Sequence, residues 1–552
     1  MSKILSTVLF ISFIIMSCTN KIDADHVYKN AVVWTGDSAL PSASVVAIKG
    51  NKIVYVGDQS DNITGEMIDL EGQMVVPGFQ DNHVHFLMGG YGLSSVQLKN
   101  AKTKEEFINT LAEFCRSHPG DFWIQGGDWD HEAWGGELPA RSWIDSVSGD
   151  HPIFIMRYDG HMALANSKAL EISKVDRNTK TPPGGEIIHD AKGEPTGIIK
   201  DEAFALVDKN IPPPSEKQYE EYFLHASTHA VENGVTTVQD MGSYGGWPEL
   251  ETYRKARTND KMLCRIYSFV PLKDWKKLDE YVKANGKGDD MLHWGGLKGF
   301  VDGSLGSTTA WFYLPYLDAP NTSGFTVTDT ADLRNWVLSA DAAGLHVAVH
   351  AIGDHANDFI LSVFETAEKN NPEKDHRFRI EHAQHLSDHA IATFAKLKVI
   401  ASMQPYHLVD DGNWAYKRLD EKRLKGTYAF KSLLDNGATL SFGSDWTVAP
   451  LAPLLGIQAA VTRQTGDGKN PGGWFPEQKI TVEQALRNYT AANAYGSFME
   501  DKLGKIKTGM LADLTILDKN LLTIDPKTIK DVRVMRTVVD GKEVYNSSHS
   551  PH

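Results

Sequence analysis

The chain is poor in cysteine and carries no excess of positive charge. Its 552 residues include only three cysteines, Cys18, Cys115 and Cys264. So few cysteines in so long a chain exclude the disulfide framework of a small secreted scaffold, although the sequence leaves open whether Cys115 and Cys264 pair. The formal net charge is −15. We therefore do not expect nucleic acid or an anionic membrane surface to be the main partner.

Long hydrophobic runs are also scarce, apart from one at the N-terminus. Ile4 to Met16 follow Lys3 and are too few to span a bilayer, which is typical of a signal peptide. Ile15-Met16-Ser17-Cys18 resembles a bacterial lipobox, in which cleavage precedes the cysteine and the thiol is acylated. We predict a lipoprotein-type signal over residues 1–17 and a lipid anchor on Cys18 as the contact with the membrane. The predicted location is the bacterial cell envelope, as a periplasmic lipoprotein. Export after ordinary cleavage is the alternative.

The most informative pattern present is His83-Val84-His85, which closes an apolar run that begins at Val75. Residues two apart in a strand point to the same face, so both imidazoles leave one side of the backbone. Two nitrogen ligands presented in this way suit one metal ion. An isolated HxH is more often a pair of solvated loop histidines, so the interpretation depends on the rest of the chain.

Four later segments have the same design, an apolar strand-like run that ends in residues able to bind a metal. They are 296–303 with Lys298 and Asp302, 345–350 ending in His350, 378–382 ending in His382, and 440–445 ending in Asp445. Stretches typical of helices lie between them, for example 331–343 and 356–369. Alternating strands and helices indicate a parallel α/β arrangement. In a (β/α)₈ barrel the C-terminal strand ends meet at one mouth, where these side chains would converge.

This order of ligand residues resembles the amidohydrolase superfamily of metal-dependent hydrolases. The similarity runs from about Ala31 to Val544, and its motifs are residues 75–85, 488–494, 503–506 and 509–514. Two further motifs resemble the branch that contains N-substituted formamide deformylases. They are Asp302-Gly303-Ser304-Leu305-Gly306-Ser307 and Asp159-Gly160-His161, which continues to Asn166-Ser167. These motifs do not specify a substrate.

The pattern and the resemblance predict an α/β fold in three parts. A (β/α)₈ TIM-like barrel would take residues 77–97 plus 215–499, and a small β-sandwich built from both chain ends would take 26–76 plus 500–548. Residues 98–214 would form a subdomain inserted after barrel strand 1. The insertion is expected because the next plausible strand, 236–240, comes about 150 residues after His85, and ordinary βα connections are far shorter.

The resemblance implies a site that activates water on one or two divalent ions. His83, His85 and Asp445 would hold the first ion, and His350 and His382 would hold a second or complete the coordination of the first. Asp445 would also take a proton from the attacking water and pass it to the leaving amine. Zn²⁺ is the expected ion, with Mn²⁺, Co²⁺ or Fe²⁺ as alternatives. Such an ion lowers the pKa of bound water toward about 7.

Two further residues have roles that the sequence leaves open. A protonated lysine cannot bind a metal, but the resemblance implies a Lys298 that is carbamylated by CO₂ and bridges two ions. Lys298 could instead anchor a carboxylate such as Asp302, or be a solvated loop residue. His161 resembles a branch-typical histidine at the barrel mouth that polarises the scissile carbonyl or binds substrate. A structural histidine is the alternative. His385, His389 and His407 are expected at the surface or behind the ligands.

Tryptophans beside the motifs are the candidates for substrate binding. They are Trp129, Trp311 and Trp446, and Trp129 could equally belong to the core of the insert. We predict a hydrolase that cleaves a C–N bond, other than a peptide bond, in a small amide, N-formyl or cyclic amide carrying an apolar or aromatic group. Deamination, ester or lactone hydrolysis, and non-catalytic ligand binding at the envelope are the alternatives. The expected partner is the small-molecule amide, with a homodimer as a further option.

Overall fold

The computed structural model describes residues 21–158, 160–242 and 246–548. At its centre, eight parallel strands form a barrel in sequence order from the first strand to the last. The strands are β8 (Phe79–Val84), β15 (Val235–Asp240), β16 (Arg265–Pro271), β17 (Leu292–Phe300), β18 (His346–Ala351), β19 (Arg379–His382), β20 (Ile400–Met403) and β21 (Thr439–Phe442). Most of their residues are buried, as expected for parallel strands covered on both faces. The predicted (β/α)₈ barrel is confirmed.

The barrel closes where the first strand meets the segment after the last. The backbone N–H of Asp445 donates to the carbonyl of His83, and the N–H of His85 donates to that of Trp446, both at 2.7 Å. Gly443 lies at this seam, where an added Cβ would come within 2.4 Å of a side-chain oxygen of the first strand. The absence of a side chain at Gly443 therefore lets the two backbones approach and brings the ligand-type residues of both segments together.

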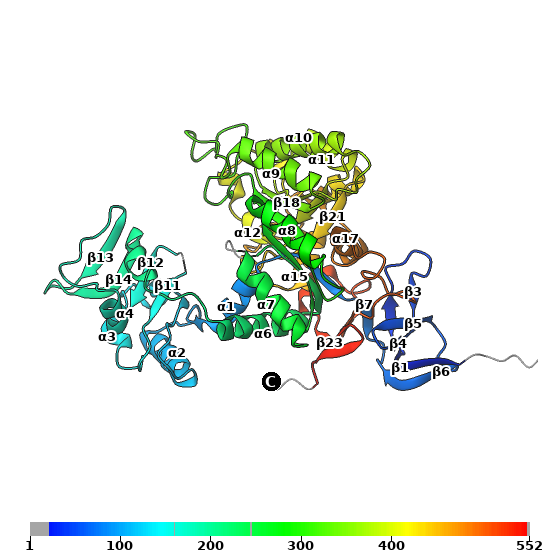
Figure 1. Cartoon of the computed structure of the whole chain (residues 1–552), viewed down its shortest axis with the longest axis horizontal. Helices are drawn as coiled ribbons and strands as arrows, with labels where there is room; N and C mark the ends of the chain where they lie inside the picture. Colours follow the sequence, from blue (N-terminus) through cyan, green and yellow to red (C-terminus); the bar gives the residue numbers. More distant parts are fainter. Residues whose placement is uncertain (1–20, 159, 243–245, 549–552) are drawn as a thin grey trace, which may run out of the picture.

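Helices cover the outside of the barrel (Figure 1). They include α1 (Phe86–Ser94), α6 (Glu216–Glu232), α7 (Trp247–Thr258), α8 (Trp275–Asn285), α9 (Thr330–Ala342), α10 (Asp354–Asn370), α11 (Asp388–Lys396), α14 (Phe430–Asp435), α15 (Pro453–Thr462), α16 (Val482–Asn488) and α17 (Ala491–Gly496). Two short helices, α12 (His407–Asp411) and α13 (Glu421–Lys425), lie in the connection after β20. The sequence defines their starts: α6, for example, begins at a capping box formed by Ser215 and Gln218. The two helices predicted at 331–343 and 356–369 are confirmed as α9 and α10.

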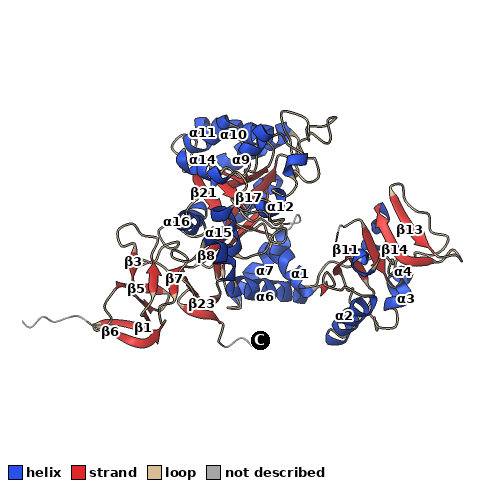
Figure 2. Ribbon diagram, turned by 180° about the vertical axis from the view of Figure 1, so that it is seen from behind, coloured by secondary structure: helices blue, strands red, loops and turns tan. Residues whose placement is uncertain are grey.

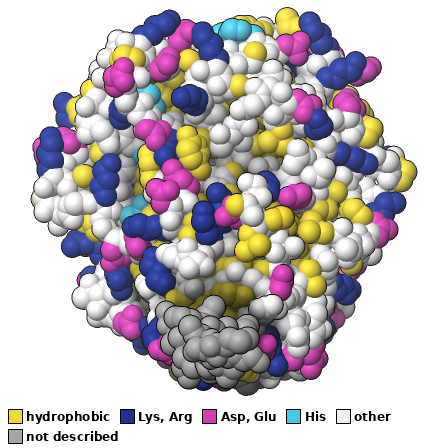
Figure 3. All heavy atoms as spheres, turned by 90° about the vertical axis from the view of Figure 1, so that its right-hand side faces the viewer, with side chains coloured by type: hydrophobic (Ala, Val, Ile, Leu, Met, Phe, Trp, Pro, Cys, Tyr) yellow, Lys and Arg dark blue, Asp and Glu magenta, His cyan; other side chains and the backbone are white. Residues whose placement is uncertain are grey.

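Strands from both chain ends pair beside the barrel. One sheet has the order β24-β23-β22-β7-β2-β3 and the other the order β5-β4-β1-β6. The strands are β1 (Ile22–Lys29), β2 (Val32–Trp34), β3 (Ser42–Ala43), β4 (Val45–Lys49), β5 (Lys52–Gly57), β6 (Ile63–Asp69), β7 (Met74–Pro77), β22 (Leu514–Leu517), β23 (Val534–Val539) and β24 (Lys542–Asn546). Tyr28 and Val46 of one sheet share a core with Val75 and Leu514 of the other. The predicted β-sandwich is therefore part of the fold. On this side of the molecule, positive and negative side chains are interspersed (Figure 3).

The segment between α1 and α6 forms a separate subdomain with its own sheet, ordered β13-β14-β12-β11-β10-β9. Its strands are β9 (Val96–Gln97), β10 (Gly126–Trp129), β11 (Phe154–Arg157), β12 (Met162–Ala165), β13 (Gly185–His189) and β14 (Pro195–Asp201). Its helices are α2 (Lys104–Ser117), α3 (Arg141–Ile144), α4 (Ser167–Ile172) and α5 (Ala205–Asp208). Figures 1 and 2 show this insert standing away from the barrel, to which it is joined near α1 and α6.

Cys115 and Cys264 are both buried and unpaired, which answers the question that the sequence left open. Over residues 21–158, 160–242 and 246–548, no helix is both long enough and apolar enough to cross a membrane. The predicted signal peptide over residues 1–17 and the predicted lipidation site Cys18 lie outside the described residues.

Candidate metal centre

Three side chains from the first and last barrel segments converge at the mouth. The Nε2 atoms of His85 and His83 lie 3.3 and 3.5 Å from Asp445 Oδ1. All three residues are buried, and their ligand atoms lie within 4.8 Å of one another. One cation could bridge such a set, because two imidazoles and a carboxylate are the donors that Zn²⁺ and similar ions prefer.

A second group shares the same aspartate. His382, His407 and Asp445 also have ligand atoms within 4.8 Å of one another. His407, at the start of α12, has its Nε2 4.0 Å from Asp445 Oδ2, and that nitrogen has no hydrogen-bond partner among the described residues. The sequence analysis expected His407 at the surface or behind the ligands. The structure corrects this, because His407 faces the carboxylate at the mouth.

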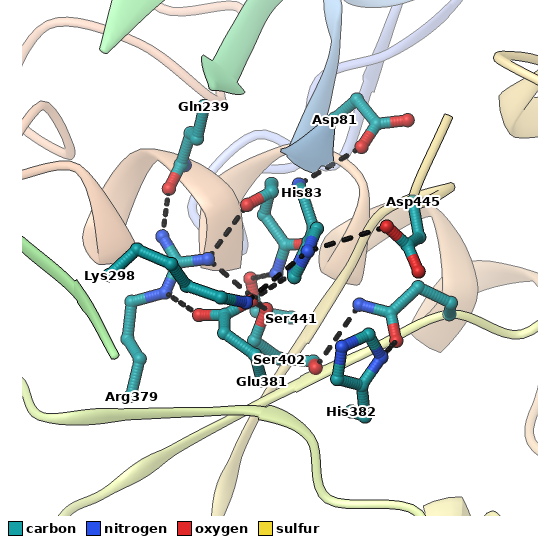
Figure 4. A network of polar contacts seen from close by, with 12 residues as sticks. Asp81, His83, Gln239, Lys298, Arg379, Glu381, His382, Ser402, Ser441 and Asp445 are labelled. Carbon is teal, nitrogen blue, oxygen red and sulfur yellow. Dashed lines mark hydrogen bonds and ion pairs between the residues drawn. The ribbon is translucent and has the colours of Figure 1, made fainter. Parts of the chain in front are cut away.

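The other ring nitrogens of three histidines are held by oxygen acceptors. His83 Nδ1 lies 2.5 Å from Glu381 Oε2 (Figure 4). His382 Nδ1 lies 2.8 Å from Gln404 Oε1. His85 Nδ1 lies 2.6 Å from a backbone carbonyl, that of residue 242. An acceptor at Nδ1 places the proton there and leaves the Nε2 lone pair for a cation. Each of the three imidazoles therefore has its Nε2 available to bind a metal ion.

Lys298 and His350 lie beside these groups without joining either. Lys298 Nζ is 3.5 Å from His83 Nε2 and points into the cluster (Figure 4). The His350 ring centroid is 4.5 Å from that of His382. However, His350 Nε2 lies 3.0 Å from the carbonyl of Gly303. The structure therefore brings all six predicted ligand positions to one mouth, with His350 turned toward a backbone carbonyl.

Burial sets the charges of these residues. It lowers the pKa of His83 to about 4 and that of His350 to about 3, with Lys298 adding to the effect in both. Burial also lowers the pKa of His382 well below its usual value. Burial alone would raise the pKa of Asp445, but His83 and His85 outweigh it and lower that pKa to about 2. His85 differs, because its hydrogen bond to Asp445 and the charge of that carboxylate outweigh burial and raise the pKa of His85. Neutral His83, His350 and His382 beside an ionised Asp445 are in the protonation states that bind a divalent cation, and His85 would bind one as the neutral imidazole.

The backbone at two of these positions is strained. His382 has φ +72° and Asp445 has φ +58°. This left-handed conformation is unfavourable for residues other than glycine and costs on the order of 1–3 kcal/mol per residue. Residues that adopt it are concentrated at functional sites. Both residues come directly at or after a strand end, where the strained turn redirects the chain at the mouth.

A buried ion pair lies directly beneath the ligands. Arg379 Nε donates to Glu381 Oε1 at 2.8 Å, and Ser402 Oγ donates to Glu381 Oε2 at 2.6 Å. Arg379 also donates to the side chain of Gln239 (Figure 4) and to the carbonyl of Asn82. Although burial opposes it, Arg379 lowers the pKa of Glu381 and keeps the carboxylate charged. The sequence analysis missed this pair. The sequence feature that could have indicated this ion pair is the presence of two charged residues, two positions apart, in an otherwise apolar strand.

Two predicted site residues lie in the insert. Trp129 is fully buried in the insert core, and its Nε1 donates to the carbonyl of Ile155 at 3.0 Å. It therefore takes the packing role that the sequence left as an alternative. His161 has its Nδ1 2.8 Å from Asp201 Oδ1, and its side chain is 77% exposed. Neither group of ligand-type residues found in the described part of the chain includes His161, and the insert that carries it stands away from the barrel (Figures 1 and 2).

The other two predicted tryptophans are in the barrel. Trp446 stacks on His229 of α6 at a centroid distance of 5.2 Å and is nearly buried. Trp311 stacks on His355 of α10 at 3.7 Å. Neither lines the cavity beside the ligands, which has a volume of about 380 Å³ and is bounded by His85 and Lys298 at one end.

A (β/α)₈ barrel with histidine and aspartate donors gathered at its mouth defines a metal-dependent hydrolase. The model of the amidohydrolase family matches residues 66–545, and the chain belongs to this family.

Similar proteins cover almost all of the chain. A solved structure of an uncharacterized metal-dependent hydrolase from Pyrococcus horikoshii has a TM-score of 0.75 and 31% identity, over 91% of this chain and 99% of that one. Protein LONG AFTER FAR-RED 3 of Arabidopsis thaliana is 40% identical, over 95% of this chain and 92% of the relative. The N-substituted formamide deformylase of Arthrobacter pascens is 26% identical, over 94% and 98%.

Proposed function

We propose that this protein hydrolyses a C–N bond, other than a peptide bond, in a small amide, N-formyl or cyclic amide substrate. The observation that carries the proposal is the meeting of His83, His85 and Asp445, which are buried and have ligand atoms within 4.8 Å of one another. The choice of an amide is supported by the similarity to an N-substituted formamide deformylase.

The residues at the mouth would have different roles in hydrolysis. A cation held by His83, His85 and Asp445 would supply Lewis acidity, which lowers the pKa of bound water toward about 7. Asp445 accepts a proton from the attacking water as the new C–O bond forms. It then returns that proton to the leaving nitrogen as the C–N bond breaks, which yields a carboxylic acid and an amine. His382 and His407 could hold a second cation together with Asp445.

Zinc is the ion that we infer, because the donors are imidazole nitrogens and a carboxylate. Removing metal with a chelator should lower amide hydrolysis at least about a hundredfold, and added Zn²⁺, Mn²⁺ or Co²⁺ should restore it. The measurement is amine release from a panel of N-formyl amines and cyclic amides. His85→Ala is the matched variant and should not recover when metal is added. Reconstituted protein that cleaves esters or lactones but no amide would refute the proposal.

We infer further that Lys298 is carbamylated when two ions are bound. Burial lowers the pKa of Lys298 to about 8, so a share of the amine is neutral at mildly alkaline pH. The neutral amine can then attack CO₂, forming an N–C bond and releasing one proton. The product is an anionic group beside His83, where the ammonium would repel cations.

Native mass spectrometry tests the state of Lys298. Protein with two ions should be heavier than its sequence and metals by about 44 Da, the mass of bound CO₂. Lys298→Arg keeps a positive charge, cannot hold the carbamate, and should show neither the extra mass nor the second ion. A wild-type protein with one ion and no extra mass would contradict this inference.

A further inference from the structure

The cavity beside the metal ligands has an apolar wall that none of the motifs indicated. It lies between the ends of three neighbouring strands and helix α9. Its apolar lining consists of Met241, Pro271, Leu272, Phe300, Val327, Leu333 and Trp336. Because His85 and Lys298 form its inner end, a molecule bound at the metal centre would extend directly into it.

Two aromatic side chains belong to this wall. Phe300 follows Lys298 by two residues, and Lys298 Nζ lies 5.1 Å from the centre of its ring. Trp336 stands one turn along α9 from the buried Leu333. Both aromatic residues are only partly buried, whereas Leu272 and Leu333 are each 1% exposed and fixed in the core.

Apart from Lys298 at the inner end, the charged groups of the lining lie at the outer edge of the cavity. Lys273, Asp329 and Asp332 line it and are exposed. Asp329 is already engaged, because its carboxylate caps α9 by accepting the N–H groups of residues 331 and 332 at 2.9 and 3.1 Å. Beyond the reach of Lys298, an ionised group buried against Trp336 would therefore lose water without gaining a partner, which is strongly unfavourable.

We propose that this cavity is the specificity pocket of the enzyme. It takes an uncharged aromatic or branched alkyl group attached within a few bonds of the scissile amide, and Phe300 and Trp336 determine that specificity. The inference rests on the proposed amide hydrolysis. The volume of about 380 Å³ falls in the range of pockets that enclose small molecules, about 300–1,000 Å³.

Three formamides with the same two-carbon spacer test the proposal on the metal-loaded protein. They are N-(2-phenylethyl)formamide, N-ethylformamide and N-formyl-β-alanine, which end in a phenyl ring, a hydrogen and a carboxylate. We expect kcat/KM to be at least about tenfold higher for the phenyl compound than for the ethyl compound. The carboxylate compound should be the poorest substrate.

Variants show whether Trp336 causes the preference. Trp336→Ala should lower the phenyl-to-ethyl ratio of kcat/KM about tenfold, and Trp336→Phe should keep most of it. Phe325→Ala is the matched control. Phe325 is an exposed aromatic residue in the loop between β17 and α9, and it does not line the cavity. Its ratio should equal that of the wild type. Thermal unfolding of each variant confirms that it is folded.

Calorimetric binding of the phenyl compound to metal-free protein separates failure of the pocket from failure of the reaction. If no formamide is cleaved but binding is present and weakened by Trp336→Ala, the amide reaction is refuted and the pocket is supported. If all three compounds are cleaved at similar rates and neither ratio nor binding responds to Trp336→Ala, the pocket is refuted and the reaction stands. A preference for the carboxylate compound would also refute the pocket.

Discussion

Replacing Asp445 with asparagine should lower kcat about a thousandfold or more. Asp445 is shared by both candidate ligand groups, with Oδ1 toward His83 and His85 and Oδ2 toward His407. Its pKa of about 2 keeps it ionised at every pH at which a protein of this kind would work. Asparagine has nearly the same shape but neither the charge that holds a cation nor the basicity that accepts a proton.

The matched control for Asp445→Asn is another buried aspartate at a strand end. Asp240 closes β15, but its oxygens accept the N–H of Phe86 and the hydroxyl of Tyr253, both at 2.9 Å. Asp240→Asn should therefore change stability more than turnover. Steady-state kinetics and metal content would be measured on both variants. The assignment of Asp445 fails if its variant retains more than about a tenth of wild-type kcat, a loss too small for a group in proton transfer.

The barrel was predictable because its strands carry a strong local signal. Each predicted strand was an apolar run, and most of these runs ended in a residue able to bind a metal. Residues 265–270 are also predicted as a strand from the sequence, and they form β16. The barrel strand that the sequence analysis did not predict was β20, whose run ends at Met403 and is followed by Gln404. Because β20 was not predicted, the position of His407 at the mouth could not be predicted either. His407 lies in the connection that follows β20.

Proximity to a motif did not identify the residues beside the cavity. Trp446 directly follows Asp445, but the backbone of Asp445 is left-handed (φ +58°) and redirects the chain between the two residues. Asp445 faces the mouth while Trp446 packs against α6. Trp336, by contrast, belongs to a helix far from any motif, and only the docking of α9 beside β17 brings it to the cavity. The position of the insert, and with it that of His161, likewise depends on packing between domains and not on a local pattern.

Glu381→Gln should weaken metal binding about 10- to 100-fold, as is usual when the partner that orients a ligand imidazole is lost. It should also destabilise the fold by about 3–5 kcal/mol, because Arg379 would remain buried without its counter-charge. Glu381 contacts both, with Oε2 on His83 at 2.5 Å and Oε1 on Arg379 at 2.8 Å.

The double variant Arg379→Met with Glu381→Gln separates these two effects. Removing both charges of a buried pair is often neutral or stabilising, so urea unfolding should show the double variant to be more stable than Glu381→Gln alone. Metal affinity, measured by competition with a chromophoric chelator, should stay low, because neither variant restores a carboxylate at His83 Nδ1. Recovery of affinity together with stability would mean that Glu381 only supports the fold. Affinity that stays low in a stable protein would identify Glu381 as the residue that positions His83 for the cation.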